Sequence, residues 1–282
     1  MRLRSLLFVP GDRPDRMEKA LASGADALIL DLEDAVAVPA KSAAREATAA
    51  FLARDRTLPL FVRINPLDSD AIDEDLAAIA RAAPDGIVLP KAEGAASVRA
   101  VIERLPRGIP ILPIATETPA AIFQLGTYQD VAARLAGLTW GAEDLPAAIG
   151  AATSREADGR YTAPYEVARS LTLFAAHAAG VAAIETVYPA YRDLDGLAGY
   201  AARGARDGFT GMLAIHPAQV PAINAAFTPL PEAVARARDI VALFDANSGA
   251  GAIGFEGRML DAPHLKQARA LLARAVADPS PP

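Results

Sequence analysis

Short apolar runs alternate with amphipathic stretches along most of the chain. The apolar runs have the length of buried strands, and the stretches between them repeat apolar residues at helical spacing. Strands are predicted at Leu6–Val9, Ala27–Leu32, Leu60–Ile64, Gly86–Leu89, Ile111–Ala115, Leu138–Trp140, Ala182–Thr186 and Met212–Ile215. Helices are predicted at Asp15–Ala22, Lys41–Leu52, Ile72–Arg81, Ser97–Arg104, Ala120–Leu135, Tyr165–Ala179 and Leu194–Arg206. Eight strand–helix units in sequence indicate a parallel sheet closed into a (β/α)8 TIM barrel.

The chain continues beyond the eighth predicted strand. A helix is predicted at Pro231–Phe244, a strand or hairpin around Phe255–Leu260 and a last helix at Leu265–Val276, followed by a frayed tail from Pro279. This surplus is too small for a second globular domain. We therefore expect a catalytic barrel over residues 1–228 and a C-terminal appendage of helix and strand over residues 229–282.

Composition narrows the class of protein. The chain of 282 residues has a net charge of −6 and no basic face, which makes nucleic acid an unlikely partner. It has no cysteine, which excludes disulfide, iron–sulfur and thiolate–zinc chemistry. The apolar start resembles a signal peptide but has too short a core and no small-residue cleavage site, and no run reaches the roughly 18 apolar residues of a membrane helix. We expect a cytoplasmic protein without a membrane partner.

Polar residues gather where the predicted strands end. In a barrel of this type the reactive groups lie at the carboxyl ends of the strands, although turns are polar for other reasons too. The polar residues at these ends are Asp31, Glu33, Asp34, Arg63, Lys91, Glu117, Asp144 and His216.

Glu117 and Asp144 follow two successive predicted strands, so both are expected at one edge of the barrel. Mg²⁺ is typically held by one or two carboxylates together with water and substrate oxygens. The pair is therefore a candidate magnesium site, although each residue also precedes a helix start and is a candidate N-cap or first-turn acid. Arg63 lies two strands away and is suited to a bidentate grip on a substrate carboxylate, or to an ion pair with one of the nearby acids.

Two other patterns carry no function. Residues 249–254 match the dinucleotide fingerprint by letter, but they follow a helix and precede a strand, the reverse of the required context. The three histidines are scattered, and no pair has the spacing of zinc ligands.

Motifs spread in order over nearly the whole chain resemble the citrate lyase β-subunit family, which includes malyl-CoA and citramalyl-CoA lyases. They are FVPG at 8–11 with Arg13 and Arg16, GADALILDLEDAV at 24–36, VRINPL at 62–67, GIVLPK at 86–91, Glu117-Thr, GAEDL at 141–145, TVYP at 186–189, GFTGMLAIHPAQ at 208–219 and GRMLDAPHL at 257–265. One small departure is Ala115-Thr116 before Glu117, where a more apolar residue is common.

The resemblance implies a Mg²⁺-dependent barrel enzyme that is usually a homotrimer. By it, Glu117 and Asp144 match the metal ligands, and Arg63 matches the arginine that binds the keto-acid carboxylate. Asp261 matches a catalytic acid from the appendage, which closes over a neighbouring subunit. Further substrate contacts are expected from Glu33, Asp34, Gly141, Ala142 and Glu143. Arg13 and Arg16 are candidates for the CoA phosphates, or simply surface arginines of a helix.

The family reaction is the reversible cleavage of a β-hydroxyacyl thioester into a thioester enolate and an α-keto acid. The enolate needs electrostatic stabilisation and then a proton, for which Asp261 is the candidate. Four alternatives stay open at this stage: a thioesterase acting on malyl-CoA, an aldolase acting on free keto acids, one subunit of a citrate lyase complex that uses an acyl-carrier thioester, and a non-catalytic scaffold. The sequence does not decide between citryl, citramalyl and malyl substrates.

Overall fold

The computed structural model describes residues 1–105, 108–247, 249 and 251–276. Two compact units divide the chain: Leu3–Asn224 form one, and Met1–Arg2 with the residues from Ala225 onward form the other. The predicted tail from Pro279 lies outside the described residues. None of the helices that the structure describes is both long enough and apolar enough to cross a bilayer.

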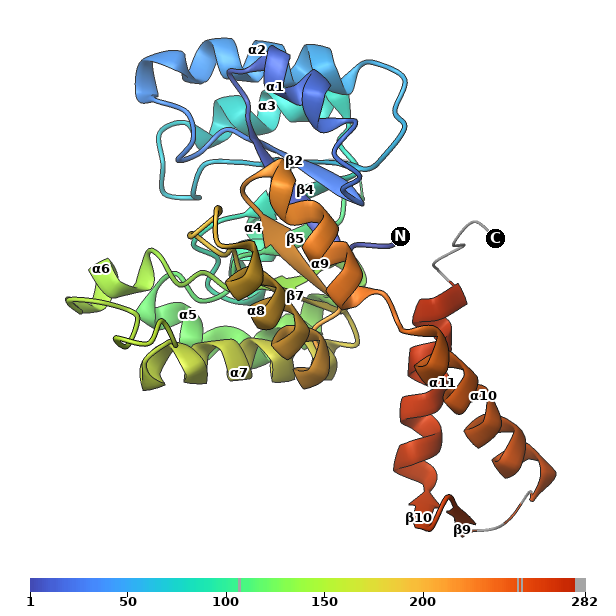
Figure 1. Ribbon diagram of the computed structural model, residues 1–282. Helices are drawn as coiled ribbons and strands as arrows, with labels where there is room; N and C mark the ends of the chain where they lie inside the picture. The colour runs from blue at the N-terminus through green and yellow to red at the C-terminus, as the bar shows by residue number, and fades with distance from the viewer. Residues whose placement is uncertain (106–107, 248, 250, 277–282) are drawn as a thin grey trace. The chain divides into compact units, whose positions relative to one another are not determined.

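The larger unit is the predicted TIM barrel (Figure 1). Its eight parallel strands neighbour one another in the order β5-β4-β3-β2-β1-β8-β7-β6. Parallel bridges Ile111↔Leu135 and Ile114↔Thr139 join the two ends of this sheet and close the barrel. The strands are β1 Ser5–Pro10, β2 Ala27–Asp31, β3 Leu60–Arg63, β4 Gly86–Leu89, β5 Ile111–Pro113, β6 Gly137–Thr139, β7 Ala182–Glu185 and β8 Gly211–Ala214. All eight strands were predicted, and each strand end lies within two residues of its predicted position.

Helices surround the strands, with α1, α2 and α3 on one side and α5 and α7 on the opposite side (Figure 1). They are α1 Pro14–Ala20, α2 Lys41–Leu52, α3 Ile72–Ala82, α4 Ala95–Arg104, α5 Pro119–Gln124, α6 Leu145–Ile149, α7 Ala163–Ala179, α8 Leu194–Asp207 and α9 Val220–Phe227, with 3-10 segments η1 Val38–Ala40, η2 Leu125–Arg134 and η3 Pro217–Gln219.

Three local features differ from the sequence prediction. The helix expected at Ala120–Leu135 is α5 followed by the 3-10 segment η2, in which Val131 has non-helical backbone angles. The helices α6 and α9 were not predicted. The first spans only about one turn, too short for a periodic signal, and the second is so apolar that it shows little contrast between its faces.

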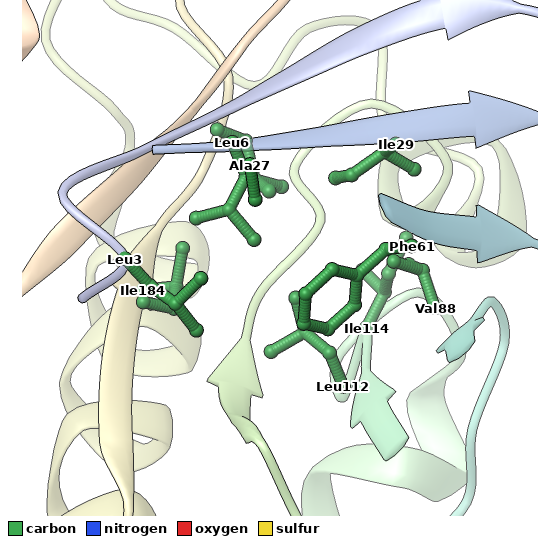
Figure 2. Packing of buried hydrophobic residues seen from close by; sticks show 10 residues of the cluster. Leu3, Leu6, Ala27, Ile29, Phe61, Val88, Leu112, Ile114 and Ile184 are labelled. Carbon is green, nitrogen blue, oxygen red and sulfur yellow. The ribbon is translucent and has the colours of Figure 1, made fainter. Parts of the chain in front are cut away.

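The barrel interior is filled by side chains from alternate strand positions (Figure 2). The cluster comprises Leu3, Leu6, Ala27, Ile29, Phe61, Val88, Leu112, Ile114, Ile184 and Leu213, all of them buried. Successive side chains of a strand point to opposite faces, so every second residue shares a face. The inward rows therefore continue from Ile29 to Asp31 on β2 and from Phe61 to Arg63 on β3, which delivers these two charged residues to the carboxyl end of the barrel.

The smaller unit contains α10 Pro231–Ala246, the hairpin of β9 Ala252–Phe255 and β10 Arg258–Asp261, and α11 Ala262–Val276. The hairpin turns through Glu256 and Gly257, both with positive φ (47° and 74°), as a two-residue type I′ turn requires. Asp261 ends the second strand of this hairpin and directly precedes α11.

Candidate functional site

Arg63 is held by two acids at the end of β2. Asp31 and Arg63 are register partners in the parallel sheet, so their side chains lie next to each other on the same face. The guanidinium donates from Nε to Asp31 Oδ1 (2.7 Å) and from Nη2 to Asp31 Oδ2 (2.6 Å), and Nη1 lies 2.8 Å from Glu33 Oε2. Burial works against the charge of Arg63, but Asp31, Glu33 and Asp34 outweigh it and raise the pKa of the guanidinium. Arg63 is thus a fixed cation.

Lys91 carries the second cation of the site. Its Nζ lies 2.8 Å from Glu33 Oε1 and 3.4 Å from Asp144 Oδ1. Its backbone is left-handed (φ 48°), a strained conformation for a residue with a side chain, and its N–H donates to Glu117 Oε2 at 2.6 Å. Burial lowers the pKa of the Lys91 ammonium, but the hydrogen bond and the charge of Glu33 raise it more. One residue therefore contacts three of the acids at the site.

Glu117 is buried, and it does not cap a helix. The N-cap of α5 is Thr118, whose hydroxyl accepts the N–H of Ala121. Thr116 lies on the other side of Glu117 and joins the ends of β5 and β6: its hydroxyl accepts the N–H of Gly141 and donates to the Gly141 carbonyl, both at 3.1 Å. A threonine at the position where an apolar residue is common therefore has a structural reason.

Asp144 occupies the N-cap position directly before α6, but its side chain makes no cap hydrogen bond. Its carboxylate is one-third exposed and forms an ion pair with Lys91. Glu117 is therefore not an N-cap, and Asp144 stands at an N-cap position without making the cap hydrogen bond. Their strands are neighbours, because the bridge Ile114↔Thr139 pairs the segment before Glu117 with the end of β6.

Burial is the largest reason why the pKa of the Glu117 carboxyl is raised from 4.5 to about 8. The negative charges of Asp144 and Glu33 raise it further, against the Lys91 N–H and ammonium, which lower it. Burial likewise raises the pKa of Glu33, although Arg63 and Lys91 oppose this. Burial thus favours the neutral, protonated form of Glu117, and a cation bound beside it would favour the charged form.

The donor set suits a hard divalent cation. Glu117 Oε1 accepts no hydrogen bond from the described residues, and it faces Gly141, where a Cβ would lie 2.6 Å from Glu117 Cγ and 3.1 Å from Oε1. The glycine therefore leaves space beside a carboxylate oxygen that is available for binding. Mg²⁺ needs only one or two carboxylates from the protein, because it takes its remaining oxygens from water and substrate.

A cavity of about 420 Å³ opens at these residues, within the range of small-molecule sites. Of the predicted site residues it brings together Arg16, Asp34, Arg63, Glu117, Gly141, Ala142, Glu143 and Asp144. Three predicted residues are not part of its lining. Glu33 is buried and bound to Arg63 and Lys91, Arg13 is half exposed and pairs with Asp15, and Asp261 belongs to the smaller unit.

Sequence reasoning left out several residues of this site. The sequence marks Asp31 and Lys91 as polar strand ends without assigning them a role. It marks Phe8, whose ring centroid lies 4.8 Å from Arg63 Cζ, only as part of a strand and of the FVPG motif. Trp140 also lines the cavity, and its Nε1 donates to the fully buried Glu185 (2.5 Å). Trp140 could have been recognised as a cavity residue from its position directly before the GAEDL motif.

The buried carboxylate of Glu185 holds the Trp140 side of the cavity in place. Besides Trp140 it accepts hydrogen bonds from Arg169 Nε (2.7 Å) and from the Tyr200 hydroxyl (2.9 Å). A carboxylate with this many donors is fully satisfied although it lies away from water. One wall of the cavity is therefore fixed by α7 and α8, which supply Arg169 and Tyr200.

The architecture and these residues match a known family. The family model described as HpcH/HpaI aldolase/citrate lyase matches residues 4–217, most of the barrel. The chain belongs to the HpcH/HpaI aldolase/citrate lyase family. Individual relatives align with nearly the whole chain, beyond the residues that the family model matches.

Relatives named for different activities are similar to this chain at comparable levels of identity. A citrate lyase subunit beta-like protein of Mycobacterium tuberculosis is 40% identical (95% of this chain, 94% of the relative). A (3S)-malyl-CoA thioesterase of Cereibacter sphaeroides is 35% identical (97% and 95%), and a mitochondrial citramalyl-CoA lyase of Mus musculus is 32% identical (96% and 86%). The crystal structure of protein CitE from M. tuberculosis with magnesium, acetoacetate and coenzyme A superposes with a TM-score of 0.83, at 39% identity and 98% coverage of both chains.

Gly141→Ala is expected to weaken Mg²⁺ binding, because the new methyl group would meet Glu117 Cγ at 2.6 Å and push its carboxylate aside. Displacing a group that orients a ligand typically costs about 10–100-fold in metal affinity. The measurement is the rise in melting temperature as Mg²⁺ is titrated. Gly126→Ala, where a Cβ meets nothing within 4 Å, is the matched control. An unchanged Mg²⁺ titration for Gly141→Ala would mean that Glu117 is not a ligand.

Proposed function

We propose that the chain is a Mg²⁺-dependent carbon–carbon lyase that cleaves a β-hydroxyacyl thioester of the citryl, citramalyl or malyl type. The products are an acetyl thioester and an α-keto acid, and the reverse reaction condenses them. The observation that carries this proposal is that two available carboxylates, Glu117 and Asp144, and a fixed guanidinium, Arg63, line one cavity at the carboxyl end of the barrel. The magnesium, acetoacetate and coenzyme A bound by the related CitE belong to the ligand classes that such a cavity suits.

Under this proposal Glu117 and Asp144 hold the metal. When bound, Mg²⁺ would act as a Lewis acid and a template for the substrate hydroxyl and the carboxylate next to it. Arg63 would grip that carboxylate, because a guanidinium has five N–H donors, more than Asp31 and Glu33 occupy. Lys91, tied to Glu33 and Asp144, would hold both acids in position.

Negative charge develops on the thioester oxygen as the carbon–carbon bond breaks, and backbone N–H groups of the loop after β6 would stabilise it. The N–H of Gly141 is already donated to Thr116. The free donors of this loop are therefore at Ala142 and Glu143, which make no backbone hydrogen bond within the described residues and lie at the cavity. Arg16 at its edge, with Arg13 further out, is assigned to the phosphates of CoA.

Asp261 would exchange a proton with the α-carbon of the acetyl thioester. We assign it to the barrel of a neighbouring copy, in a homotrimer that works in the cytoplasm, with residues 229–282 as the part that closes over that barrel. The support for this arrangement is the resemblance of the GRMLDAPHL motif and the presence of Asp261 on a separate compact unit.

The experiment is to incubate the protein with Mg²⁺ and citramalyl-CoA, malyl-CoA or citryl-CoA in turn, and to resolve the products by mass. Acetyl-CoA together with pyruvate, glyoxylate or oxaloacetate is expected from one of the three, and the keto acid names the substrate. Turnover of none of the three would contradict the proposal as a free-standing CoA enzyme and would direct the search to an acyl-carrier thioester.

A second candidate is a thioesterase that hydrolyses malyl-CoA-like thioesters. The observation that favours it is the (3S)-malyl-CoA thioesterase of Cereibacter sphaeroides, which matches 97% of this chain. The same incubation separates the two activities, because hydrolysis gives free CoA and an intact hydroxy acid, without acetyl-CoA.

A further inference from the structure

Asp261 and His264 form a close pair at the start of α11. His264 Nδ1 lies 2.6 Å from Asp261 Oδ1, and the backbone N–H of Asp261 points to the same nitrogen at 3.2 Å. Both side chains are about half exposed, so the pair lies at the surface of the smaller unit. No backbone N–H of the described residues donates to the Asp261 carboxylate, in contrast to Asp193, whose carboxylate accepts the Gly196 N–H at the start of α8. The carboxylate of Asp261 is thus not a helix cap.

The 2.6 Å contact requires a proton. An unprotonated ring nitrogen and an ionised carboxylate oxygen are both acceptors and would repel each other at this distance. Nδ1 can either accept the Asp261 N–H at 3.2 Å or, when it carries a proton, donate to Oδ1 at 2.6 Å, but it cannot do both. The second bond is shorter and charge-assisted and is therefore the stronger, so the proton is assigned to Nδ1 and the backbone N–H does not use this nitrogen as its acceptor. A carboxylate that accepts a hydrogen bond from one ring nitrogen of a histidine determines that this nitrogen carries the proton.

We propose that His264 is a positioning residue for Asp261: its Nδ1–H donates to Oδ1, fixes the carboxylate and leaves Oδ2 available to accept a proton. This inference rests on the proposed function, in which Asp261 acts on the acetyl thioester. In the condensation direction the α-carbon C–H bond breaks, its electron pair remains as the thioester enolate, and an O–H bond forms at Oδ2. Cleavage returns the same proton to carbon. His264 itself touches no substrate and neither gains nor loses a proton in this step.

The geometric half of the proposal is tested without any assay of activity. The chain has three histidines, so ¹⁵N-histidine labelling gives a spectrum that the variants His264→Asn and His177→Ala assign. His264 is expected to carry its proton on Nδ1, and Asp261→Asn is expected to remove that proton from Nδ1. His216 serves as an internal reference, because its Nδ1 accepts the Ala218 N–H and bonds to no carboxylate among the described residues, so this nitrogen is expected to be unprotonated. An unprotonated Nδ1 at His264 in the unaltered protein would overturn the proposal.

The functional half uses the lyase assay. His264→Ala is expected to lower kcat about 10–100-fold with little change in KM for the thioester, as for residues that orient a reacting group. His264→Asn is expected to recover part of the loss, since its amide N–H can donate to the carboxylate, and His177→Ala is the control. An unchanged kcat in His264→Ala would overturn the role of His264. Full activity in Asp261→Asn would instead remove Asp261 from the proposed function, and the ¹⁵N result would still stand.

Discussion

Arg63→Ala is expected to lower kcat/KM by at least about 100-fold, because the substrate carboxylate would lose its charge-assisted hydrogen bonds and its orientation. The same change is expected to reduce the free energy of unfolding by about 3–5 kcal/mol, since it leaves the buried carboxylates of Asp31 and Glu33 without their main partner. The measurements are steady-state kinetics at a temperature where circular dichroism shows the variant folded, and denaturant unfolding.

Two further variants isolate the causes. Arg63→Lys keeps the charge but cannot bond to both oxygens of Asp31 in one plane, so we expect most of the activity loss with a smaller loss of stability. Arg99→Ala removes an exposed ion pair with Asp130 (3.7 Å) and is expected to change stability by less than about 1 kcal/mol and activity not at all. Near-normal kcat/KM in Arg63→Lys would show that Arg63 contributes only its positive charge and that bidentate hydrogen bonds to the substrate carboxylate are not needed.

Glu117→Gln is expected to stabilise the Mg²⁺-free protein at pH 8 and to abolish its stabilisation by Mg²⁺. The pKa of the Glu117 carboxyl is about 8 in the folded protein, chiefly because of burial, against 4.5 for an ordinary glutamate. Between these two values the folded state binds a proton that the unfolded state does not, so stability falls as the pH rises. A shift of this size corresponds to a few kcal/mol. A neutral glutamine removes the effect while still accepting the Lys91 N–H.

The comparison is thermal unfolding of the unaltered protein and Glu117→Gln from pH 5 to pH 8.5, with a chelator and then with Mg²⁺. The melting temperature of the unaltered protein is expected to fall relative to the variant as the pH rises, and Mg²⁺ is expected to restore it only in the unaltered protein. Glu103→Gln, at an exposed position on α4, is the control and should follow the unaltered protein. Equal pH dependence in the unaltered protein and Glu117→Gln would show that this carboxyl is not protonated near neutral pH.

The fold was predictable because its main signal is local. Each barrel strand is a short apolar run, and the order of strands and helices leaves few topologies open. The departures have equally local causes. The helix α6 is about one turn long, and the apolar helix α9 lacks the contrast between faces on which periodicity depends.

The part of the site that could be predicted is the set of residues at the ends of strands. Arg63, Glu117 and Asp144 each follow an apolar run, so their common edge could be inferred from the chain alone. The contacts between them could not. Lys91 directs its N–H at Glu117 because its backbone is left-handed, and the sequence gives no sign of such a conformation at a residue other than glycine. The hydrogen bonds between Arg63 and Asp31 depend on the register of β2 and β3, which the sequence does not show. The role proposed for His264 likewise could not be predicted, because it rests on the 2.6 Å distance between its Nδ1 and Asp261 Oδ1.

The central claim is that the carboxylates at the ends of β5 and β6 support Mg²⁺-dependent cleavage of a carbon–carbon bond. The most direct measurement is the formation of acetyl-CoA and keto acid from the turned-over thioester, compared between the unaltered protein, Glu117→Gln and Asp144→Asn across a Mg²⁺ titration. We predict equimolar acetyl-CoA and keto acid in the unaltered protein, and loss of both products in each variant at every Mg²⁺ concentration at which it remains folded. Full Mg²⁺-dependent product formation in either variant would contradict the claim.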